Sequence, residues 1–179
     1  IENNTASVSG GGVYLVESGA KFKNVIVRNN TGAIDGGGMF LLKSAAEIAD
    51  STIATHTVTG YGGGIYLDES GAQIRTSLLI SNSAGVGAGI YAIESPAAIS
   101  YNRIFSNTAT ATPVFSGTIP LDPSGGGGVY AERSDAKVQS SIIEYNSAGA
   151  GTGAGLHFWD FRQPEINSNV VADNLGAGV

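Results

Sequence analysis

A glycine-led segment recurs along the chain at a nearly constant interval. It reads GGGVYL at residues 10–15, GGGMFL at 36–41 and GGGIYL at 62–67. Three further copies follow, and the aliphatic markers of the six copies are separated by 26, 26, 25, 39 and 27 residues. These markers are Val13, Met39, Ile65, Ile90, Val129 and Leu156. A period of this length is typical of solenoids, in which each repeat packs on its neighbours.

Two other patterns repeat in phase with the first. In one, an aliphatic residue is followed three residues later by asparagine or, once, by histidine: Asn4, Asn30, His56, Asn82, Asn107, Asn146 and Asn174. In the other, an apolar residue recurs after a turn: Phe22, Ile48, Ile74, Ile99, Val138 and Ile166. Each period therefore contains three short apolar stretches separated by Gly, Ser, Asn or Asp.

The apolar stretches show the alternation that β-strands require. Val13 and Leu15 lie at alternate positions, as do Ile65 and Leu67. Three short strands per period, each stacked on the same strand of the next period, predict an all-β right-handed parallel β-helix of about seven coils of ~26 residues. A leucine-rich horseshoe would need its own consensus and a helix, and a propeller would need a longer repeat with antiparallel strands.

In such a fold, equivalent residues of successive coils lie above one another in columns, about 4.8 Å apart. We expect the glycines to turn the chain before the first strand, where the coils approach closely. The asparagine column is expected to form an internal ladder, in which each side chain bonds to the next rung and caps the turn. His56 is interpreted as a structural rung of this ladder rather than a catalytic base.

The chain is predicted to form one domain, a β-helix segment spanning residues 1–179. Neither end shows the polar terminal coil that solenoids require, so we expect the segment to belong to a longer β-helix, with end-to-end self-association as the alternative. One irregularity interrupts the repeat, a loop insertion at 108–125 that is rich in proline and apolar residues. It is expected to fold back onto a wall and cover part of an outer face.

The composition excludes several functions. The net charge is −6 and the nine Lys and Arg residues are scattered, which argues against nucleic-acid binding. No apolar run is long enough for a membrane-spanning helix. The chain has no cysteine and its two histidines fall in different columns, so no disulfide, metal site or cofactor is expected.

The alternation of glycine-glycine-small-aliphatic motifs with hydrophobic-x-x-Asn motifs resembles the repeats of chlamydial polymorphic outer membrane proteins and of other bacterial β-helix surface proteins. The resemblance extends over nearly the whole chain, through the copies given above. It departs from the chlamydial pattern where Ile, Val or Leu replaces the usual phenylalanine of the second motif, and where cysteines are missing. The resemblance implies an extracellular or cell-surface bacterial domain for adhesion or surface coating, and it supplies no catalytic residues.

If the aliphatic markers point inward, the residues that follow them point outward. This aromatic column reads Tyr14, Phe40, Tyr66, Tyr91, Tyr130 and His157, and Trp159 lies two residues beyond the last of these. A row of rings at this spacing is able to stack against the faces of sugars, so these side chains are candidate ligand-binding residues. The alternative is that like residues stack on one another and only stabilise the wall.

Outward acidic residues suggest a second kind of site. Asp68, Glu94 and Glu132 lie near the ends of neighbouring strands, and paired carboxylates are required for glycoside hydrolysis. Pectin-degrading β-helix hydrolases and lyases carry such residues on one outer face. The adjacent corner column mostly alternates in sign, which a ladder of exposed ion pairs also explains: Glu17, Lys43, Glu69, Glu94, Arg133 and Asp160.

These features favour a non-enzymatic, secreted or surface-displayed β-helix scaffold that serves as an adhesin, a stalk or a filament-forming segment. Its partner would be a polysaccharide or another cell-surface ligand. Two alternatives stay open. One is a polysaccharide lyase or glycoside hydrolase at Asp68, Glu94 and Glu132, beneath the 108–125 loop, and the other is a carbohydrate-binding surface on the aromatic column.

Overall fold

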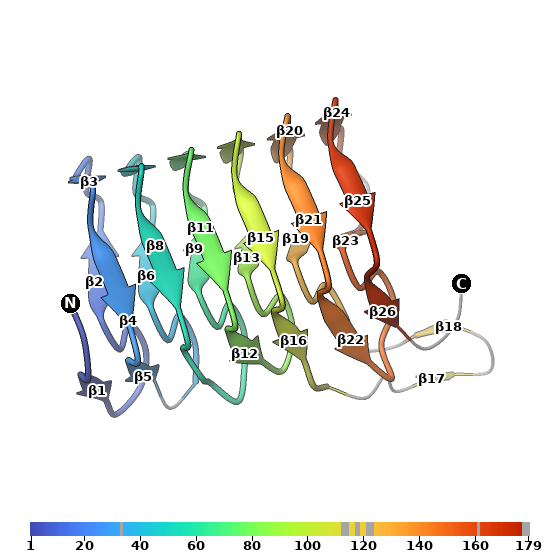
Figure 1. The fold of residues 1–179 in the computed structure, drawn as a ribbon, viewed down its shortest axis with the longest axis horizontal. Coiled ribbons are helices and arrows are strands. Elements are labelled where there is room, and N and C mark those ends of the chain that lie inside the picture. The colour runs from blue at the N-terminus through green and yellow to red at the C-terminus, as the bar shows by residue number, and fades with distance from the viewer. Residues whose placement is uncertain (33, 112–114, 117–118, 121–123, 161, 177–179) are drawn as a thin grey trace.

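The computed structural model describes residues 1–32, 34–111, 115–116, 119–120, 124–160 and 162–176. Within these residues the regular elements are short strands, which wind repeatedly around one axis to form an elongated solenoid (Figure 1). Strands β1 (Thr5–Ala6) and β26 (Leu175–Gly176) lie at opposite ends of this axis. Four walls surround the core, named here back, upper, front and lower after their places in Figure 1.

The back and front walls each contain six strands. The back wall follows the glycine segments and consists of β2 (Val13–Val16), β6 (Met39–Leu42), β9 (Ile65–Asp68), β13 (Ile90–Ile93), β19 (Val129–Glu132) and β23 (Leu156–Trp159). The front wall consists of β4 (Ile26–Arg28), β8 (Thr52–Ala54), β11 (Leu78–Ile80), β15 (Arg103–Phe105), β21 (Ile142–Glu144) and β25 (Val170–Ala172).

The upper and lower walls join them. The upper wall consists of β3 (Lys21–Lys23), β7 (Glu47–Ala49), β10 (Gln73–Arg75), β14 (Ala98–Ser100), β20 (Lys137–Gln139) and β24 (Glu165–Asn167). The lower wall is formed by β1, β26 and the short strands β5 (Thr31–Gly32), β12 (Ser83–Ala84), β16 (Thr108–Ala109) and β22 (Ser147–Gly149).

Each strand of these walls pairs in parallel with the same strand of the neighbouring coils. On the back wall, Ile65 is aligned with Met39 and Ile90. On the front wall, Leu79 is aligned with Ile53 and Ile104 in the same way. This one-coil register stacks equivalent side chains, and it confirms the predicted all-β parallel solenoid.

Two details differ from the prediction. The solenoid has about six coils rather than seven, because Asn4 belongs to a partial coil in which Glu2 forms only an isolated bridge with Arg28. Most coils also have a fourth strand in addition to the three that the repeat predicts, and at Thr57 this position forms only isolated bridges to Thr31 and Ser83. This lower strand arises because the two residues after the asparagine corner are extended, so that Thr5 pairs with Thr31.

The core is a continuous apolar cluster enclosed by the walls. Its members are the inward residues of the back, upper and front strands, such as Leu67, Ile74 and Leu79, which are fully buried. Outward neighbours in the same strands are more exposed, as the burial alternation in β6 and β9 shows. Burial of these aliphatic columns is the main stabilising contribution.

The asparagines form an internal ladder at the corner between the front and lower walls. The backbone N–H of Asn82 donates to Oδ1 of Asn107 at 3.0 Å, and Nδ2 of Asn107 donates to the carbonyl of Leu79 at 3.1 Å. In the same way, the N–H of Asn107 donates to Oδ1 of Asn146, and Nδ2 of Asn146 donates to the carbonyl of Ile104. Each rung therefore satisfies corner backbone groups that would otherwise be buried without a partner.

His56 occupies one rung and reproduces the asparagine bonds with its ring. Its Nδ1 accepts the N–H of Asn30 at 3.1 Å, and its Nε2 lies 3.0 Å from the carbonyl oxygen of Val27. This geometry requires the neutral imidazole with the proton on Nε2. Burial accordingly lowers the pKa of His56 below its usual value of 6.5. The ring thus bonds to the same kind of corner backbone groups as the asparagine rungs do.

Two further ladders run inside the upper corners, and both consist mainly of serine. At the first, each backbone N–H donates to the next hydroxyl at 2.9–3.1 Å, through Ser18, Ser44, Ser70, Ser95 and Ser134. At the second, the acceptors are Ser51, Ser77, Asn102, Ser141 and Asn169. Three corners of every coil are thus held by side-chain bonds to the coil beyond.

The fourth corner, before the back wall, is made by the glycine segment. Gly62 has a φ of +64°, which glycine adopts without strain. At Gly63 a Cβ would lie 2.6 Å from the carbonyl oxygen of Ser83 and 2.8 Å from that of Ala88. The sharp turn and the close backbone approach both follow the expectation from the repeat.

The extra residues of the predicted 108–125 insertion lie between β16 and β19, whereas Thr108 and Ala109 themselves form β16 and pair with the lower-wall strands β12 and β22. Within it, β17 (Phe115–Ser116) and β18 (Ile119–Pro120) pair in antiparallel fashion, whereas every wall strand pairs in parallel. Positions 112–114, 117–118 and 121–123, including Pro113 and Pro123, lie outside the described residues. Ala111, on the N-terminal side, packs against the aromatic side chains of the back wall.

Candidate functional site

The aromatic column lies on the outer face of the back wall, and its rings stack on one another. Ring centroids are 4.9 Å apart between Tyr14 and Phe40, 4.8 Å between Phe40 and Tyr66, and 5.4 Å between Tyr66 and Tyr91. The rings of these pairs are within 11° of parallel. Because parallel strands place like residues above each other, the strand register alone produces this stack.

Exposure of the column changes along the solenoid. Tyr14 is 54% exposed, whereas Tyr91 is 3% exposed and Tyr130 is fully buried. Tyr91 and Tyr130 form a cluster with Val86, against which Tyr61, Tyr66, Ala111 and Trp159 pack. An open strip of rings is therefore present only toward the N-terminal end, and ligand binding by this column stays a prediction.

His157 and Trp159 continue the column at the last back-wall strand. The His157 ring is tilted by 45° against Tyr130, with centroids 4.6 Å apart, and Trp159 meets it edge-on. Its Nδ1 lies 3.2 Å from both the hydroxyl and the carbonyl oxygen of Thr152, and burial lowers its pKa. His157 therefore makes these contacts with other residues of the back wall and of the corner that precedes it.

The three candidate catalytic carboxylates lie on three successive coils, and Arg133 contacts two of them. The guanidinium of Arg133 donates to Glu94 at 3.1 Å and to Glu132 at 2.5 Å. Glu132 also accepts a hydrogen bond of 2.5 Å from the hydroxyl of Tyr91. Asp68 is separated from Glu132 by Ile93 in the strand register.

Asp68 differs electrostatically from the other two. Partial burial raises the pKa of its carboxyl, and the negative charges of Glu69 and Glu94 raise it further, while Lys43 opposes them. A carboxyl with a raised pKa beside a second carboxylate is the kind of group that general acid catalysis uses.

The residues of the corner column beside these carboxylates have the left-handed backbone conformation. Glu69, Glu94 and Arg133 have φ values between 44° and 48°, and each N–H donates to the strand end of the next coil. Exposed ion pairs join Lys43 to Glu69 at 3.7 Å and Arg133 to Glu94 at 3.1 Å. Solvent-exposed pairs of this kind contribute little stability, on the order of 0–1 kcal/mol.

Two hollows adjoin this corner. A polar one of about 380 Å³ is lined by Glu69, Glu94, Pro96, Arg133, Asp135 and Arg162. A more apolar one of about 580 Å³, near the last coil, is lined by Ala131, Ser134, Phe158, Trp159, Asp160, Arg162 and Pro164. Within the described ranges, no group of His, Asp and Glu side chains is arranged to hold a metal ion.

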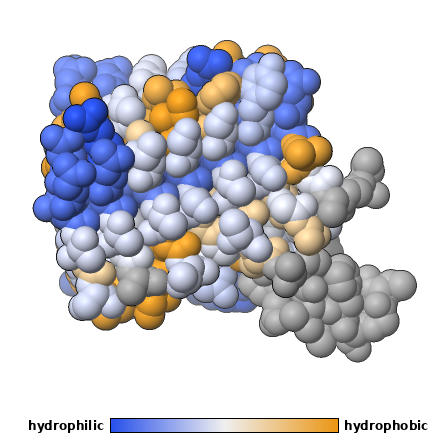
Figure 2. All heavy atoms as spheres, turned by 60° about the horizontal axis from the view of Figure 1, so that its bottom comes forward, coloured by the Kyte–Doolittle hydropathy of each residue, from blue (hydrophilic) through white to orange (hydrophobic). Residues whose placement is uncertain are grey.

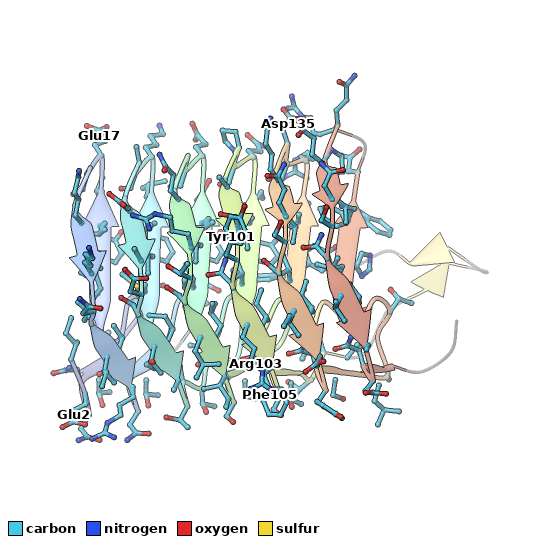
Figure 3. The ribbon with its side chains drawn as sticks, turned by 45° about the horizontal axis from the view of Figure 1, so that its top comes forward. Glu2, Glu17, Tyr101, Arg103, Phe105 and Asp135 are labelled. Atoms are coloured by element: carbon cyan, nitrogen blue, oxygen red, sulfur yellow. The ribbon has the colours of Figure 1, made fainter. Side chains whose placement is uncertain are left out.

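The front wall carries an aromatic cluster that the repeat analysis overlooks. Arg103 lies over the ring of Phe105, 4.7 Å from its centroid, and Tyr145 contacts that ring edge-on at 5.3 Å. In Figure 3, Arg103 and Phe105 lie close together on β15, whereas Tyr101 lies at the corner before that strand, away from them. The signal that could have revealed the cluster is its departure from the repeat, because equivalent positions of other coils hold no aromatic residue.

The whole chain, residues 1–179, matches the family model of the right handed beta helix region. The chain therefore belongs to this family, and its solenoid is a right-handed parallel β-helix. No curated protein and no solved structure matches the chain. Domains of this family are often extracellular, and none of the described residues forms a helix able to cross a membrane. The particular likeness to the chlamydial proteins stays a prediction.

Proposed function

We propose that the chain is a non-catalytic scaffold of secreted or surface-displayed kind, serving as a stalk or adhesin that holds binding surfaces on a stiff rod. The observation that supports this role most directly is the engagement of its polar side chains. Three internal ladders bond each coil to the next through buried Asn, His and Ser residues. Such bonds resist local opening and suit a mechanical role.

The outer acidic residues also support a scaffold. Glu94 and Glu132 are engaged by Arg133, and Glu132 is further bonded to Tyr91. A catalytic pair would need one carboxyl free to give a proton and another free to act as base or nucleophile. Here Oε1 of Glu94 and both carboxylate oxygens of Glu132 already accept hydrogen bonds from Arg133 and Tyr91.

A second candidate, polysaccharide cleavage, is favoured by one observation. Asp68 has a raised carboxyl pKa next to the charges of Glu69 and Glu94, and a polar hollow is lined by both of these glutamates and Arg133. In this alternative, Asp68 would donate the proton to the leaving oxygen, and Glu94 or Glu132 would act as the base.

One assay separates the two candidates. The chain is incubated with a panel of plant and bacterial polysaccharides, and reducing ends and unsaturated products are measured. The matched control is the triple variant Asp68→Asn, Glu94→Gln, Glu132→Gln, which keeps the side-chain shapes. A scaffold gives no product above this control. Product that the triple variant abolishes would overturn the scaffold proposal and support cleavage.

The rod itself is tested by hydrogen exchange on the intact chain. The ladder N–H groups of Asn30, His56, Asn82 and Asn107 are expected to exchange only through global unfolding. Exchange of these amides as fast as that of an unfolded peptide would contradict a stiff, ladder-bonded scaffold.

A further inference from the structure

Three tyrosines of the aromatic column form a continuous run of rings on the back wall. The ring centroids are 5.4 Å apart between Tyr66 and Tyr91 and 5.3 Å apart between Tyr91 and Tyr130, and the rings of both pairs are within 11° of parallel. We call these three residues the tyrosine run. Phenol and indole rings are among the protein groups that most readily give up a single electron. Because the rings of the run stack in contact, an electron can pass from one ring to the next.

A tryptophan connects the tyrosine run to solvent. Trp159, the single tryptophan of the chain, packs against the cluster that contains Tyr91 and Tyr130. His157 lies between them, with its ring centroid 4.6 Å from that of Tyr130 and 6.2 Å from that of Trp159. Trp159 is partly exposed and lines the hollow of about 580 Å³, whereas Tyr91 and Tyr130 are buried. An oxidant in solution therefore reaches the indole more readily than either buried phenol.

Tyr91 has a base in place to accept its proton. A phenol that loses an electron becomes strongly acidic, so its oxidation is assisted by a base within hydrogen-bond reach. The hydroxyl of Tyr91 donates to Oε2 of Glu132 at 2.5 Å. Arg133 donates to the other oxygen of this carboxylate, Oε1, so Oε2 is directed at the phenol. Tyr91 can thus lose an electron and a proton together, and no positive charge stays on the buried ring.

The other two members of the run lack this arrangement. The hydroxyl of Tyr130 is buried without a hydrogen-bond partner among the described residues. In the same part of the chain, the hydroxyl of Tyr66 is bonded to no carboxylate. Oxidation of Tyr130 would leave its proton in a buried site with no acceptor, which is costly. The run therefore favours Tyr91 as the place where an unpaired electron comes to rest.

The electrostatic surroundings of the run favour the loss of an electron. Burial raises the pKa of the Tyr66, Tyr91 and Tyr130 phenols, and the negative charge of Glu132 raises the pKa of each of them further. The same negative charge stabilises the positive charge that develops on a ring as its electron leaves. Glu132 is therefore placed to assist oxidation both as a charge and as a proton acceptor.

Other faces of the rod arrange their apolar side chains differently. On the front wall, Phe105 meets Tyr145 edge-on, and its ring is covered by Arg103 rather than by a second ring. On the lower side, apolar side chains stand in separate groups, with hydrophilic and intermediate side chains between them (Figure 2). The back wall is thus where the described residues provide a stacked route from the surface to a buried phenol.

We propose that Trp159, the tyrosine run and Glu132 together donate single electrons to small one-electron oxidants, such as inorganic radicals, at the surface of the rod. The oxidant takes one electron from the indole of Trp159. Tyr91 then returns one electron to Trp159 through the packed rings, while its O–H bond breaks and the proton passes to Oε2 of Glu132. The products are the reduced oxidant, the original indole, a neutral phenoxyl radical on Tyr91 and a neutral carboxylic acid at Glu132.

This activity goes beyond the scaffold role and does not depend on it. An oxidising radical that meets the outer surface is consumed, and the unpaired electron is held inside the wall at Tyr91. The oxidant class is recognised by its chemistry and by access to Trp159 through the hollow, so no specific binding pocket is required.

The test is pulse radiolysis of the intact chain with the azide radical, a small one-electron oxidant that attacks indole. All proteins carry Tyr14→Phe, Tyr101→Phe and Tyr145→Phe, because these three tyrosines are more than half exposed and would be oxidised directly. Transient absorption separates the tryptophanyl radical from the tyrosyl radical. The first is expected to decay at the rate at which the second forms, and this rate should not change with protein concentration.

Two further substitutions identify the donor and the base. Tyr91→Phe keeps the ring in the stack and removes the hydroxyl, so it is expected to abolish the conversion. Glu132→Gln keeps the side-chain shape and should slow the conversion by about a hundredfold or more, the usual contribution of a positioned base. Tyr66→Phe is the matched control, because it removes a hydroxyl from the neighbouring ring of the same stack and should leave the rate unchanged.

The outcomes are distinct. Loss in Tyr91→Phe and slowing in Glu132→Gln, with Tyr66→Phe unchanged and the melting temperatures retained, support the proposal. It is overturned if no tyrosyl radical forms from the tryptophanyl radical, if the rate rises with protein concentration, if Tyr91→Phe converts normally, or if Tyr66→Phe loses the conversion as well. Should Tyr91→Phe fail to fold, Glu132→Gln decides, because an unaltered rate in that variant overturns the proposal and a slowed rate supports it. None of these results changes the expectation for the cleavage assay.

Discussion

The back and front walls both display aromatic side chains, but they do so in different ways. On the back wall, Phe40, Tyr66 and Tyr91 occupy equivalent positions of successive coils and stack within 5.4 Å of one another. On the front wall, Tyr101 and Tyr145 stand alone among small polar residues of their columns. This difference indicates that an aromatic residue present at the same position of successive coils is explained by packing between coils. An aromatic residue present in one coil alone needs another explanation.

Substitutions should therefore affect the two walls differently. Residues that repeat in a column are bonded to or packed on both neighbouring coils, so their replacement should reduce stability. A residue whose type differs from that of the equivalent residues in other coils does not take part in such a stack. Its replacement should therefore leave the stability of the fold nearly unchanged. Five changes probe this distinction, in order of expected size.

The largest effect is expected for Tyr91→Ala in the middle of the stack. Tyr91 is 3% exposed, lies between two rings and donates to Glu132. Removing it should lower the free energy of unfolding by about 3–5 kcal/mol. Urea denaturation measures the loss, and Tyr14→Ala, at the exposed end of the same column, should cost less than about 1 kcal/mol. Equal losses of unfolding free energy in the two variants would show that membership of the stacked column, rather than burial of the ring, determines the contribution of each residue to stability.

Gly63→Val should come next. Its Cβ would meet the carbonyl oxygens of Ser83 and Ala88, which belong to neighbouring backbone and cannot rotate away. A loss of about 3 kcal/mol is expected from forced separation of the coils. Gly71→Ala is the control, since a Cβ there meets no atom within 4 Å. Equal soluble yield and equal melting temperature of the two variants would contradict the close approach at the glycine corner.

Asn82→Leu removes one rung of the ladder. It leaves the N–H of His56 and the carbonyl of Ile53 buried without their partners. The expected loss is about 1–3 kcal/mol by thermal or chemical denaturation. Asn82→His should retain a large part of this stability, because His56 already serves as a rung in the neighbouring coil. A leucine variant as stable as the histidine variant would exclude an energetic role for the ladder.

The histidine rung makes stability depend on pH. The pKa of His56 is lowered by burial, and the groups bonded to its ring, the backbone N–H of Asn30 and the carbonyl of Val27, carry no charge. The unfolded chain therefore binds a proton more readily, so the contribution of His56 to stability is present above pH 6.5 and is lost as the pH falls below it. The free energy of unfolding measured from pH 7.5 to 5 should fall less in His56→Asn than in the unaltered chain. His157 acts with the same sign and is unchanged in both. If the free energy of unfolding depended on pH identically in both proteins, a buried, neutral His56 side chain would be contradicted.

The smallest change in stability is expected for Tyr101→Ala. The ring is two-thirds exposed and lies outside any aromatic column. The free energy of unfolding should change by less than about 0.5 kcal/mol. A melting temperature lowered as far as by Tyr91→Ala would remove the distinction between repeated and solitary aromatic residues.

The sequence was sufficient to predict the architecture because the period places Ile65, Met39 and Ile90 in one column before any coordinates exist. The asparagine rungs follow from the same period. The serine ladders repeat equally well, at Ser44, Ser70 and Ser95, yet serine is so common in turns that its recurrence carries little weight.

The candidate site was less predictable. Periodicity indicates that Tyr91 and Tyr130 face outward, but it does not show that Val86, Tyr61 and Trp159 pack over them. Nor does it show that Arg133 joins Glu94 to Glu132, since that depends on side-chain direction at a left-handed corner. The cluster of Arg103, Phe105 and Tyr145 on the front wall was missed for the opposite reason, because a search for repeats passes over residues that do not repeat.

The ladder has one more consequence, which concerns how such a chain can change over evolution. The rung from Asn82 to Asn107 spans 25 residues and the rung from Asn107 to Asn146 spans 39, yet both are bonded at 3.0 Å. The corner between β16 and β19 can therefore accept extra sequence without altering the stacking on either side. New chemistry can be introduced there by insertion alone, while the rod that carries it is inherited unchanged.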